Sequence, residues 1–322
     1  KKLIHINPEA EHMIKKEDLE NLSFDEFFRK IGADITFGDL IYIKNESTPE
    51  RQTEYNGRYL KLIFAPIETD SKISGVLVVM RDITNQEKLE LSRREFVSNV
   101  SHELRTPLTT VKSYAETLLD NSVDDKELSG RFLSVIIKEA DRMTRIVKDL
   151  LTLSRLDEAQ TENKEPDAID LQLLLEGVAE KMYITAKKKN QTITCKSISA
   201  VPKFYSDRDK IEQLVINIVS NAIKYTPEGG KIDIVSGIMI NDAFIKVTDN
   251  GIGIPKENIP RLFERFYRVD KARSRDTGGT GLGLAISKQL ADNLGGEITI
   301  NSDVGKGTEV LITLPVKGNQ TD

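Results

Sequence analysis

Apolar residues recur at steps of three and four over two long stretches in the middle of the chain, which predicts two amphipathic helices. The first pattern runs from Asn85 to Asp120 and the second from about Arg131 to Asp157, with the polar loop Asn121–Gly130 between them. Two helices joined by a short loop form an antiparallel hairpin whose apolar seam is left partly exposed, so we expect a dimer that forms a four-helix bundle. The alternative is that these stripes pack on another domain of the same chain. The stripes consist of Val97, Val100, Leu104, Leu108, Val111, Ala115 and Leu118, and of Leu133, Ile136, Ala140, Met143, Val147 and Leu150.

The residues before the hairpin, 1–84, are predicted to form a small α+β module. Short polar helical segments extend through Ile31, and strand-like runs follow at Leu40–Lys44, Arg58–Glu68 and Ser74–Arg81. Because Asp70-Ser71-Lys72 is typical of a turn, the last two strands should pair in an antiparallel sheet with one covered face.

The residues after the hairpin, 159–322, alternate between helix and strand patterns. The polar stretch 158–168 is interpreted as a linker, and Asp170 as the cap of a helix. Two further helices are predicted at Asp207–Tyr225 and Gly281–Leu294, and together the patterns predict a two-layer α/β sandwich with a mixed sheet. The strands are expected at Thr192–Ile198, Lys231–Ile240, Phe244–Thr248, Glu297–Asn301 and Glu309–Leu314. The whole chain is thus a multidomain α+β protein with domains at 1–84, 85–158 and 159–322.

Composition narrows the function classes. The 322 residues carry a net charge of -5, with basic and acidic residues spread along the chain, which argues against a nucleic-acid partner. The single cysteine, Cys195, excludes an intrachain disulfide. The longest apolar stretch, Ile73–Met80, is far too short to span a bilayer. The chain begins at Lys1, and we expect it to be an excised fragment.

The strongest candidate for chemistry on the first helix is His102, in the run Ser101–Leu108. At about 100° per residue, His102 lies opposite Val100 and Leu104 and should face outward. Glu103 adjoins it, and Thr106 falls one turn further on the same side. An exposed histidine is more often a solvated surface residue, so the case for this one depends on the rest of the chain.

Three segments downstream point to a nucleotide. Asn217, Asn221 and Lys224 share one face of a helix, where amide oxygens can ligate Mg²⁺ and a lysine can neutralise phosphate. Asp249-Asn250-Gly251-Ile252-Gly253 follows a strand, where a carboxylate can accept a hydrogen bond from the adenine amino group and the glycines allow close backbone approach. Gly278–Gly283 leads into a helix, so its N–H groups and the helix dipole favour phosphate. The flanking residues fit neither a Rossmann fingerprint nor a P-loop.

Two weaker signals accompany these segments. Arg265-Phe266-Tyr267-Arg268 mixes aromatic and basic residues between the second and third of them. Gly305-Lys306-Gly307-Thr308 is either a hairpin turn or a segment that brings the Thr308 hydroxyl to the base, and the sequence does not decide between these alternatives.

With these motifs assembled, residues 86–317 strongly resemble the sensor histidine kinases of bacterial two-component systems. Ser101–Leu108 is similar to the phosphoacceptor box of that family, and four nucleotide boxes follow in the order of the family: Asn217–Tyr225, Asp249–Ile254, Leu262–Val269 and Gly279–Gly283. Residues 1–83, which end in Arg81-Asp82-Ile83-Thr84, resemble a PAS sensor module whose opening strand is missing. The run Glu95–Val100 and the placement of the PAS module are similar to the WalK/VicK group of cell-wall-regulating kinases of Gram-positive bacteria.

The resemblance implies a function and a set of roles. ATP would phosphorylate His102, Glu103 would orient the imidazole and act as base, and Lys224 and Arg268 would offset charge on the transferred group. Thr106 would position water for dephosphorylation of a response regulator, which is also the expected acceptor of the phosphoryl group. Asn221 would hold Mg²⁺, and the glycine loop would act as a lid. The implied ATP-binding residues are Asn217, Asn221, Lys224, Tyr225, Asp249, Gly251, Gly253, Tyr267, Arg268, Gly279, Thr280, Gly281, Leu282, Gly283 and Thr308.

Two rivals remain at this stage. The first rival function is a clamp-type ATPase, because the resemblance implies a nucleotide fold shared with gyrase and Hsp90. Those ATPases carry a glutamate where this chain has Asn217. A catalytically idle ATP-binding scaffold is the other. The resemblance also implies a cytoplasmic location with a membrane anchor upstream of Lys1.

Overall fold

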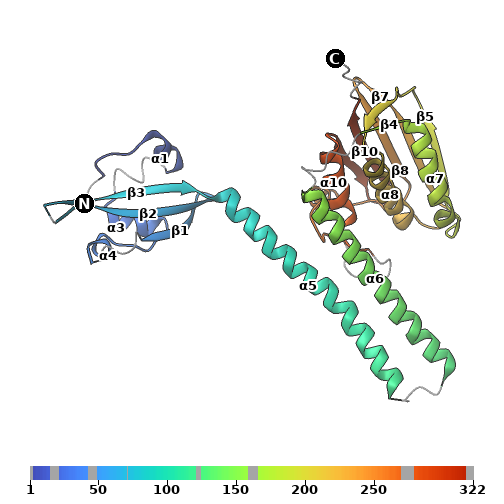
Figure 1. The fold of residues 1–322 in the computed structure, drawn as a ribbon, viewed down its shortest axis with the longest axis horizontal. Helices are drawn as coiled ribbons and strands as arrows, with labels where there is room; N and C mark the ends of the chain where they lie inside the picture. Colours follow the sequence, from blue (N-terminus) through green and yellow to red (C-terminus); the bar gives the residue numbers. More distant parts are fainter. Residues whose placement is uncertain are drawn as a thin grey trace. The chain divides into compact units, whose positions relative to one another are not determined.

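The computed structural model describes residues 3–14, 22–42, 49–70, 72–120, 125–158, 166–269 and 279–316. The chain divides into two compact units, Lys1–Ser98 and Asn99–Asp322. Figure 1 shows the order of the elements along the chain. Among the described residues, no helix is both long enough and apolar enough to cross a membrane.

The first unit packs short helices against one face of an antiparallel sheet, as predicted. The strands are β1 (Glu50–Tyr55), β2 (Arg58–Thr69) and β3 (Lys72–Asp82), in the order β1-β2-β3. Alternate β2 side chains, among them Leu62 and Phe64, are fully buried, and the Phe64 ring lies 5.0 Å from that of Phe28. The helices are α1 (Pro8–Met13), α3 (Phe24–Lys30) and α4 (Phe37–Tyr42).

The strand predicted at Leu40–Lys44 is wrong over its described part, since Phe37–Tyr42 forms helix α4. The reason is a capping box: the Asp39 carboxylate accepts from the Thr36 backbone N–H at 2.8 Å, and the Asp39 N–H donates to the Thr36 hydroxyl at 3.2 Å. Residues 43 and 44 lie outside the described residues. The polar strand β1, which pairs with β2 at the edge of the sheet, was not predicted at all.

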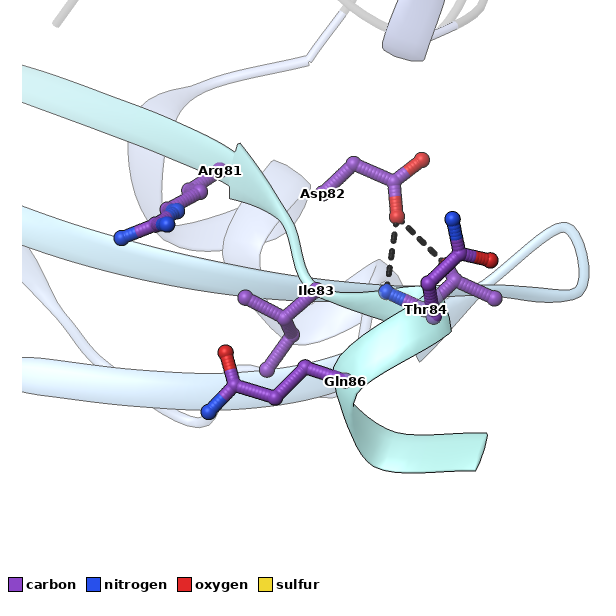
Figure 2. A pocket seen from close by; sticks show the side chains of 6 residues that line it. Arg81, Asp82, Ile83, Thr84 and Gln86 are labelled. Carbon is purple, nitrogen blue, oxygen red and sulfur yellow. Dashed lines mark hydrogen bonds between the residues drawn. The ribbon is translucent and has the colours of Figure 1, made fainter. Parts of the chain in front are cut away.

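A tight turn joins the sheet to the first long helix, α5 (Thr84–Leu119), as Figure 2 shows. The Asp82 carboxylate accepts from both the backbone N–H and the hydroxyl of Thr84, at 2.9 and 2.5 Å. The Thr84 hydroxyl in turn accepts from the Tyr59 N–H at 2.9 Å. These bonds fix the point at which the chain leaves β3 and becomes helical.

The second long helix, α6 (Lys126–Glu158), begins five residues earlier than predicted. Its polar first turn resembles a loop in sequence, but the Asp125 side chain accepts from the Glu127 N–H at 2.8 Å and caps the helix. Within the second unit, the rings of Tyr114 on α5 and Phe132 on α6 pack edge-to-face at 4.9 Å. The predicted helical hairpin is therefore confirmed.

The rest of the second unit is the predicted two-layer sandwich. A five-stranded sheet in the order β5-β7-β8-β10-β9 is mixed, because β5 pairs parallel to β7 and the other pairs are antiparallel. Three helices cover one face of it (Figure 1). The helices are α7 (Leu171–Lys187), α8 (Arg208–Tyr225) and α10 (Gly283–Asn293); the strands are β5 (Thr192–Ser197), β7 (Lys231–Met239), β8 (Asp242–Asp249), β9 (Glu297–Asp303) and β10 (Gly307–Pro315).

Local capping explains where α7 and α8 begin. The Asp170 carboxylate accepts from the Leu173 N–H at 3.2 Å, as the sequence predicts, and Asp207 caps α8 in the same way at 3.1 Å. The end of the predicted linker 158–168 is not a linker but part of a short strand, β4 (Asp167–Ile169). This strand pairs with β6 (Phe204–Ser206) because Ile169 and Phe204 are both buried in the core.

Candidate nucleotide and phosphoacceptor site

His102 lies on the exposed face of α5, as its position in the helical pattern predicts. Its imidazole makes no hydrogen bond with any other residue that the structure describes. The Thr106 hydroxyl, one turn further along, donates to the His102 backbone carbonyl at 3.2 Å. The ring is therefore accessible to a reaction partner from solvent or from another domain.

The neighbouring Glu103 is half-buried and doubly paired. Its Oε2 atom accepts from Arg142 Nη2 on α6 at 2.9 Å and from Arg268 Nη2 at 2.9 Å. Arg268 follows the short 3-10 helix η1 (Lys256–Arg261) of the sandwich, so one carboxylate links both helices of the hairpin to the nucleotide domain. In this arrangement Glu103 contacts two arginines rather than the imidazole that it is expected to orient.

Part of the glycine loop is also attached to the hairpin. Gly278 lies outside the described residues, but Thr280 is buried, and its hydroxyl donates to the Asp149 carboxylate on α6 at 2.7 Å. Burial raises the pKa of Asp149 above its ordinary value, and the Thr280 hydrogen bond opposes that shift. Gly281 has φ +75, and its carbonyl accepts from the Phe266 N–H at 2.9 Å.

Two contacts near the end of α6 complete this junction. Arg265 donates from Nη2 to both carboxylate oxygens of Asp157, at 3.0 and 3.2 Å. The Asn293 amide of α10 donates to the Leu156 carbonyl at 3.2 Å. Neither pair was predicted, because each joins residues more than a hundred positions apart.

The predicted polar face of α8 is present. Asn217 accepts from the Gln213 amide at 2.8 Å, but its own Nδ2 is buried without a hydrogen-bond partner. Asn221 is half-buried, and its side chain makes no hydrogen bond with the described residues. Lys224 completes the row, with its ammonium 4.9 Å from the centre of the Tyr225 ring.

Lys224 is the most strongly perturbed group of the site. Burial lowers its pKa to about 8, and repulsion by Arg268, Arg145 and Arg142 adds to the shift. A Cβ atom built at Gly279 would lie 2.3 Å from its ammonium, so the glycine loop passes directly over this lysine. The loop and the cationic end of α8 thus form one surface.

Asp249 ends β8 and is held by backbone donors. Its Oδ1 accepts from the N–H of Gly251 at 2.8 Å and of Thr308 at 3.3 Å. Burial raises the pKa of Asp249, and these two hydrogen bonds oppose the shift. The segment before Thr308 is a hairpin turn between β9 and β10, as one of the two interpretations predicts. The turn brings the Thr308 N–H to Asp249, whereas the Thr308 hydroxyl lies 3.0 Å from that of Ser302, so its approach to a base stays a prediction.

The glycines after Asp249 are required by close backbone contacts. A Cβ at Gly251 would lie 2.7 Å from the Tyr225 carbonyl oxygen. Gly253 has φ +68, and a Cβ there would lie 2.0 Å from the Asp303 carbonyl oxygen. No larger residue fits either position without movement of the backbone.

Tyr267 takes a different position from the other predicted residues. Its hydroxyl donates to Asn258 Oδ1 at 2.6 Å, and the guanidinium of Arg261 lies 4.5 Å from its ring centre. These contacts tie Tyr267 to η1.

Arg142 is a site residue that the sequence analysis missed. It shares a helical face with the buried Ile146 one turn later, and a charged residue on that buried face was the available signal.

Comparison with known proteins places these features in a family. Residues 92–159 match the His Kinase A (phospho-acceptor) domain, and residues 206–318 match the histidine kinase-, DNA gyrase B- and HSP90-like ATPase domain. The sensor histidine kinase WalK of Bacillus subtilis is 41% identical over 89% of this chain and 47% of its own length. The sensor protein kinase WalK of Staphylococcus aureus is 41% identical over 81% of this chain and 63% of its own length. The chain thus spans about half the length of these curated relatives.

Solved structures agree with this assignment. The histidine kinase AdeS of Acinetobacter baumannii is 25% identical with a TM-score of 0.54, covering 67% of this chain and 98% of that one. Full-length ShkA in complex with AMPPNP is 29% identical with a TM-score of 0.51, covering 69% of this chain and 45% of that one. The fold of ThkA, solved with its response regulator protein TrrA, is similar over 97% of this chain and 92% of that one, with a TM-score of 0.57 at 24% identity. With both domain matches on one chain, in the order that the motifs predict, the protein belongs to the sensor histidine kinase family.

Proposed function

We propose that this chain is an ATP-dependent protein-histidine kinase that transfers the γ-phosphoryl group of ATP to His102. One observation carries the proposal. Within one compact unit, the exposed His102 adjoins Glu103, whose carboxylate accepts a hydrogen bond from Arg268. Arg268 in turn repels the ammonium of Lys224, which lies beneath the glycine loop. The acceptor and the cationic end of the nucleotide face are therefore adjacent parts of one structure.

The adenine end of the site is assigned to Asp249. Both of its backbone hydrogen bonds go to Oδ1, so Oδ2 is left to accept a hydrogen bond from the adenine amino group. Gly251 and Gly253 keep side chains away from the base, and Thr308 borders the same carboxylate. The solved ShkA complex contains the ATP analogue AMPPNP, which supports nucleotide binding by this related fold.

The phosphate end is assigned to the glycine loop, Lys224 and Arg268. Asn221 is the proposed ligand of Mg²⁺, which when bound neutralises charge between the phosphates. The residues fit that ion: the Asn221 amide oxygen is not taken up by another described residue. No cluster of three His, Cys, Asp or Glu side chains suited to a metal occurs among the described residues, so the remaining Mg²⁺ ligands are expected to come from phosphate and water.

The transfer itself uses one ring nitrogen of His102 as nucleophile. That nitrogen forms a bond to the γ-phosphorus while the bond from this phosphorus to the bridging oxygen of ADP breaks. Positive charge develops on the imidazole, and Glu103 is the proposed acceptor of a hydrogen bond from the other ring N–H. This role requires Glu103 to leave Arg142 and Arg268, which hold its carboxylate in the present arrangement.

The partners follow from the family. We propose a homodimer through the hairpin, supported by apolar residues of the predicted stripes that are about half exposed, such as Val97, Leu108 and Leu133. The phosphoryl group would then pass to an aspartate of a response regulator, and Thr106, exposed one turn from His102, would position water for the reverse dephosphorylation. Control of the cell wall stays a prediction from the WalK/VicK resemblance.

The rival ATPase function is disfavoured by Asn217. A clamp-type ATPase needs a carboxylate base at that position, whereas the Asn217 amide oxygen already accepts from Gln213. An idle scaffold would bind ATP without forming a phosphoprotein.

Labelling with γ-³²P ATP distinguishes the three functions. The kinase becomes labelled, and the label is acid-labile, base-stable and absent from His102→Gln, which still binds ATP. Release of phosphate from ATP without a phosphoprotein would favour the ATPase, and ATP binding without either product would favour the scaffold. Labelling of a mixture of the His102→Gln and Asp249→Asn chains would show that transfer occurs between protomers.

A further inference from the structure

Two buried guanidinium groups from different parts of the second unit converge on a single oxygen atom. Arg142 comes from α6 and Arg268 from the segment after η1, and both donate through Nη2 to Oε2 of Glu103. Each arginine side chain is only 7% exposed, whereas that of Glu103 is 28% exposed. The cations are thus fixed deep in the junction, and the anion lies nearer to its surface.

The two arginines have more hydrogen-bond donors than the Glu103 carboxylate can satisfy. Both Arg142 Nε and Arg268 Nε are buried without a hydrogen-bond partner. The other acidic contact is a long one, between Arg142 Nη1 and Glu139 Oε2 at 3.7 Å. A guanidinium presents a planar fork of donors suited to two oxygens of a carboxylate or phosphate, and a buried unpaired donor is costly. The geometry therefore leaves capacity for an anion with more oxygens.

Positive charge at this point also exceeds negative charge. Besides the two arginines, Lys224 and Arg145 contribute, since both Arg142 and Arg145 repel the Lys224 ammonium. Glu139 and Asp149 offset two of these four charges, so about two positive charges remain once Glu103 is displaced. A phosphoryl group carries about two negative charges and three acceptor oxygens, which matches this excess better than one carboxylate does. Lys224 lies under the glycine loop, so the surplus charge is on the phosphate side of the nucleotide face.

We propose that Arg142 and Arg268 form a binding site for the terminal phosphate of ATP, and that the Glu103 carboxylate occupies this site until the phosphate displaces it. The inference rests on the proposed kinase function and deepens it, because it assigns Arg142 of the hairpin as a phosphate-binding residue. The same exchange releases Glu103 beside His102. Arrival of the phosphate and readiness of the acceptor are thereby coupled.

The test compares affinities for AMPPNP and ADP, which differ by the terminal phosphate, measured calorimetrically with Mg²⁺ on the full 322-residue chain. Arg142→Gln removes a charge-assisted contact to that phosphate, so AMPPNP binding should weaken about tenfold or more while ADP binding stays within twofold. Glu103→Gln removes the negative charge that competes with the terminal phosphate for the two arginines, so the preference for AMPPNP over ADP should increase. Arg131→Gln is the matched control on the same helix and should change neither affinity. Arg131 is exposed, and within the described part of the chain its one ion pair is with Glu127.

The outcomes separate this inference from the proposed function. If Arg142→Gln leaves AMPPNP affinity unchanged, or weakens AMPPNP and ADP equally, the arginine pair is not a terminal-phosphate site. If Glu103→Gln fails to raise the AMPPNP preference, the carboxylate is not a competitor. Retained ADP binding shows that a variant with weakened AMPPNP binding is folded. Failure of the unaltered chain to bind either nucleotide would instead remove the kinase proposal itself.

Discussion

Replacing Asp249 by Asn should weaken ATP binding without weakening the fold. The two backbone N–H groups that Asp249 holds both bond to Oδ1, at 2.8 Å from Gly251 and 3.3 Å from Thr308. An asparagine carbonyl oxygen can accept the same two bonds. The change is therefore confined to Oδ2, where a charged acceptor becomes an N–H₂ donor that faces the adenine amino group.

The magnitude follows from that single contact. A hydrogen bond to a charged group contributes about 1.5–3 kcal/mol, so ATP affinity should fall about 10- to 150-fold. The stability effect has the opposite sign. Because burial raises the pKa of Asp249, its ionised form destabilises the fold at neutral pH, and neutral Asn should be equally or more stable there. That gain should disappear below about pH 4, where the unfolded carboxyl is also protonated.

Calorimetric titration with ATP and with inosine triphosphate, which lacks the 6-amino group, measures the effect. The unaltered chain should prefer ATP, and Asp249→Asn should lose that preference. Asp242→Asn, at the exposed start of the same strand, is the control and should bind both as before. An unchanged ATP affinity in Asp249→Asn would remove this residue from the adenine site.

Two further predictions concern stability. Lys224→Met should raise the free energy of unfolding at pH 7, because the lowered pKa of about 8 means that the charged lysine destabilises the folded state. The difference between variant and unaltered chain should shrink as the pH rises from 8 towards the ordinary lysine pKa of 10.5. Urea unfolding at pH 7 and pH 10 measures this, and an equal difference at both pH values would contradict the prediction. Gly253→Ala should lower the free energy of unfolding by several kcal/mol, because the new Cβ would lie 2.0 Å from the Asp303 carbonyl oxygen. Gly305→Ala is the control: Gly305 also has a positive φ but lies in open space, so the loss should be only about 1 kcal/mol. Equal losses on urea unfolding would show that the close contact does not matter.

Much of the fold was predictable because it depends on periodic burial. Helix α8 illustrates this, since Ile211, Leu214, Val215 and Ile218 recur at helical spacing and are all buried. The errors occurred where local hydrogen bonds outweigh the apolar pattern. Reciprocal capping by Thr36 and Asp39 makes a helix of a segment that resembles a strand.

The candidate site was predictable only as a set of residues. Local spacing brings Asn217, Asn221 and Lys224 onto one helical face, so sequence reasoning finds them. The pairing of Glu103 with Arg268, 165 positions apart, depends on how the sandwich packs on the hairpin, and no local pattern encodes that. The same packing bonds Thr280 to Asp149, which is why the contacts of the glycine loop with α6 were not foreseen.

Mapping the phosphorylated residue tests the central claim most directly. The chain is incubated with ATP and Mg²⁺, digested with trypsin and kept at alkaline pH, under which phosphohistidine persists, before mass spectrometry. The account predicts one added phosphoryl group in the peptide of residues 95–105, located on His102, and none at that position when ADP replaces ATP. A phosphoryl group found on another residue, with His102 unmodified, would contradict it.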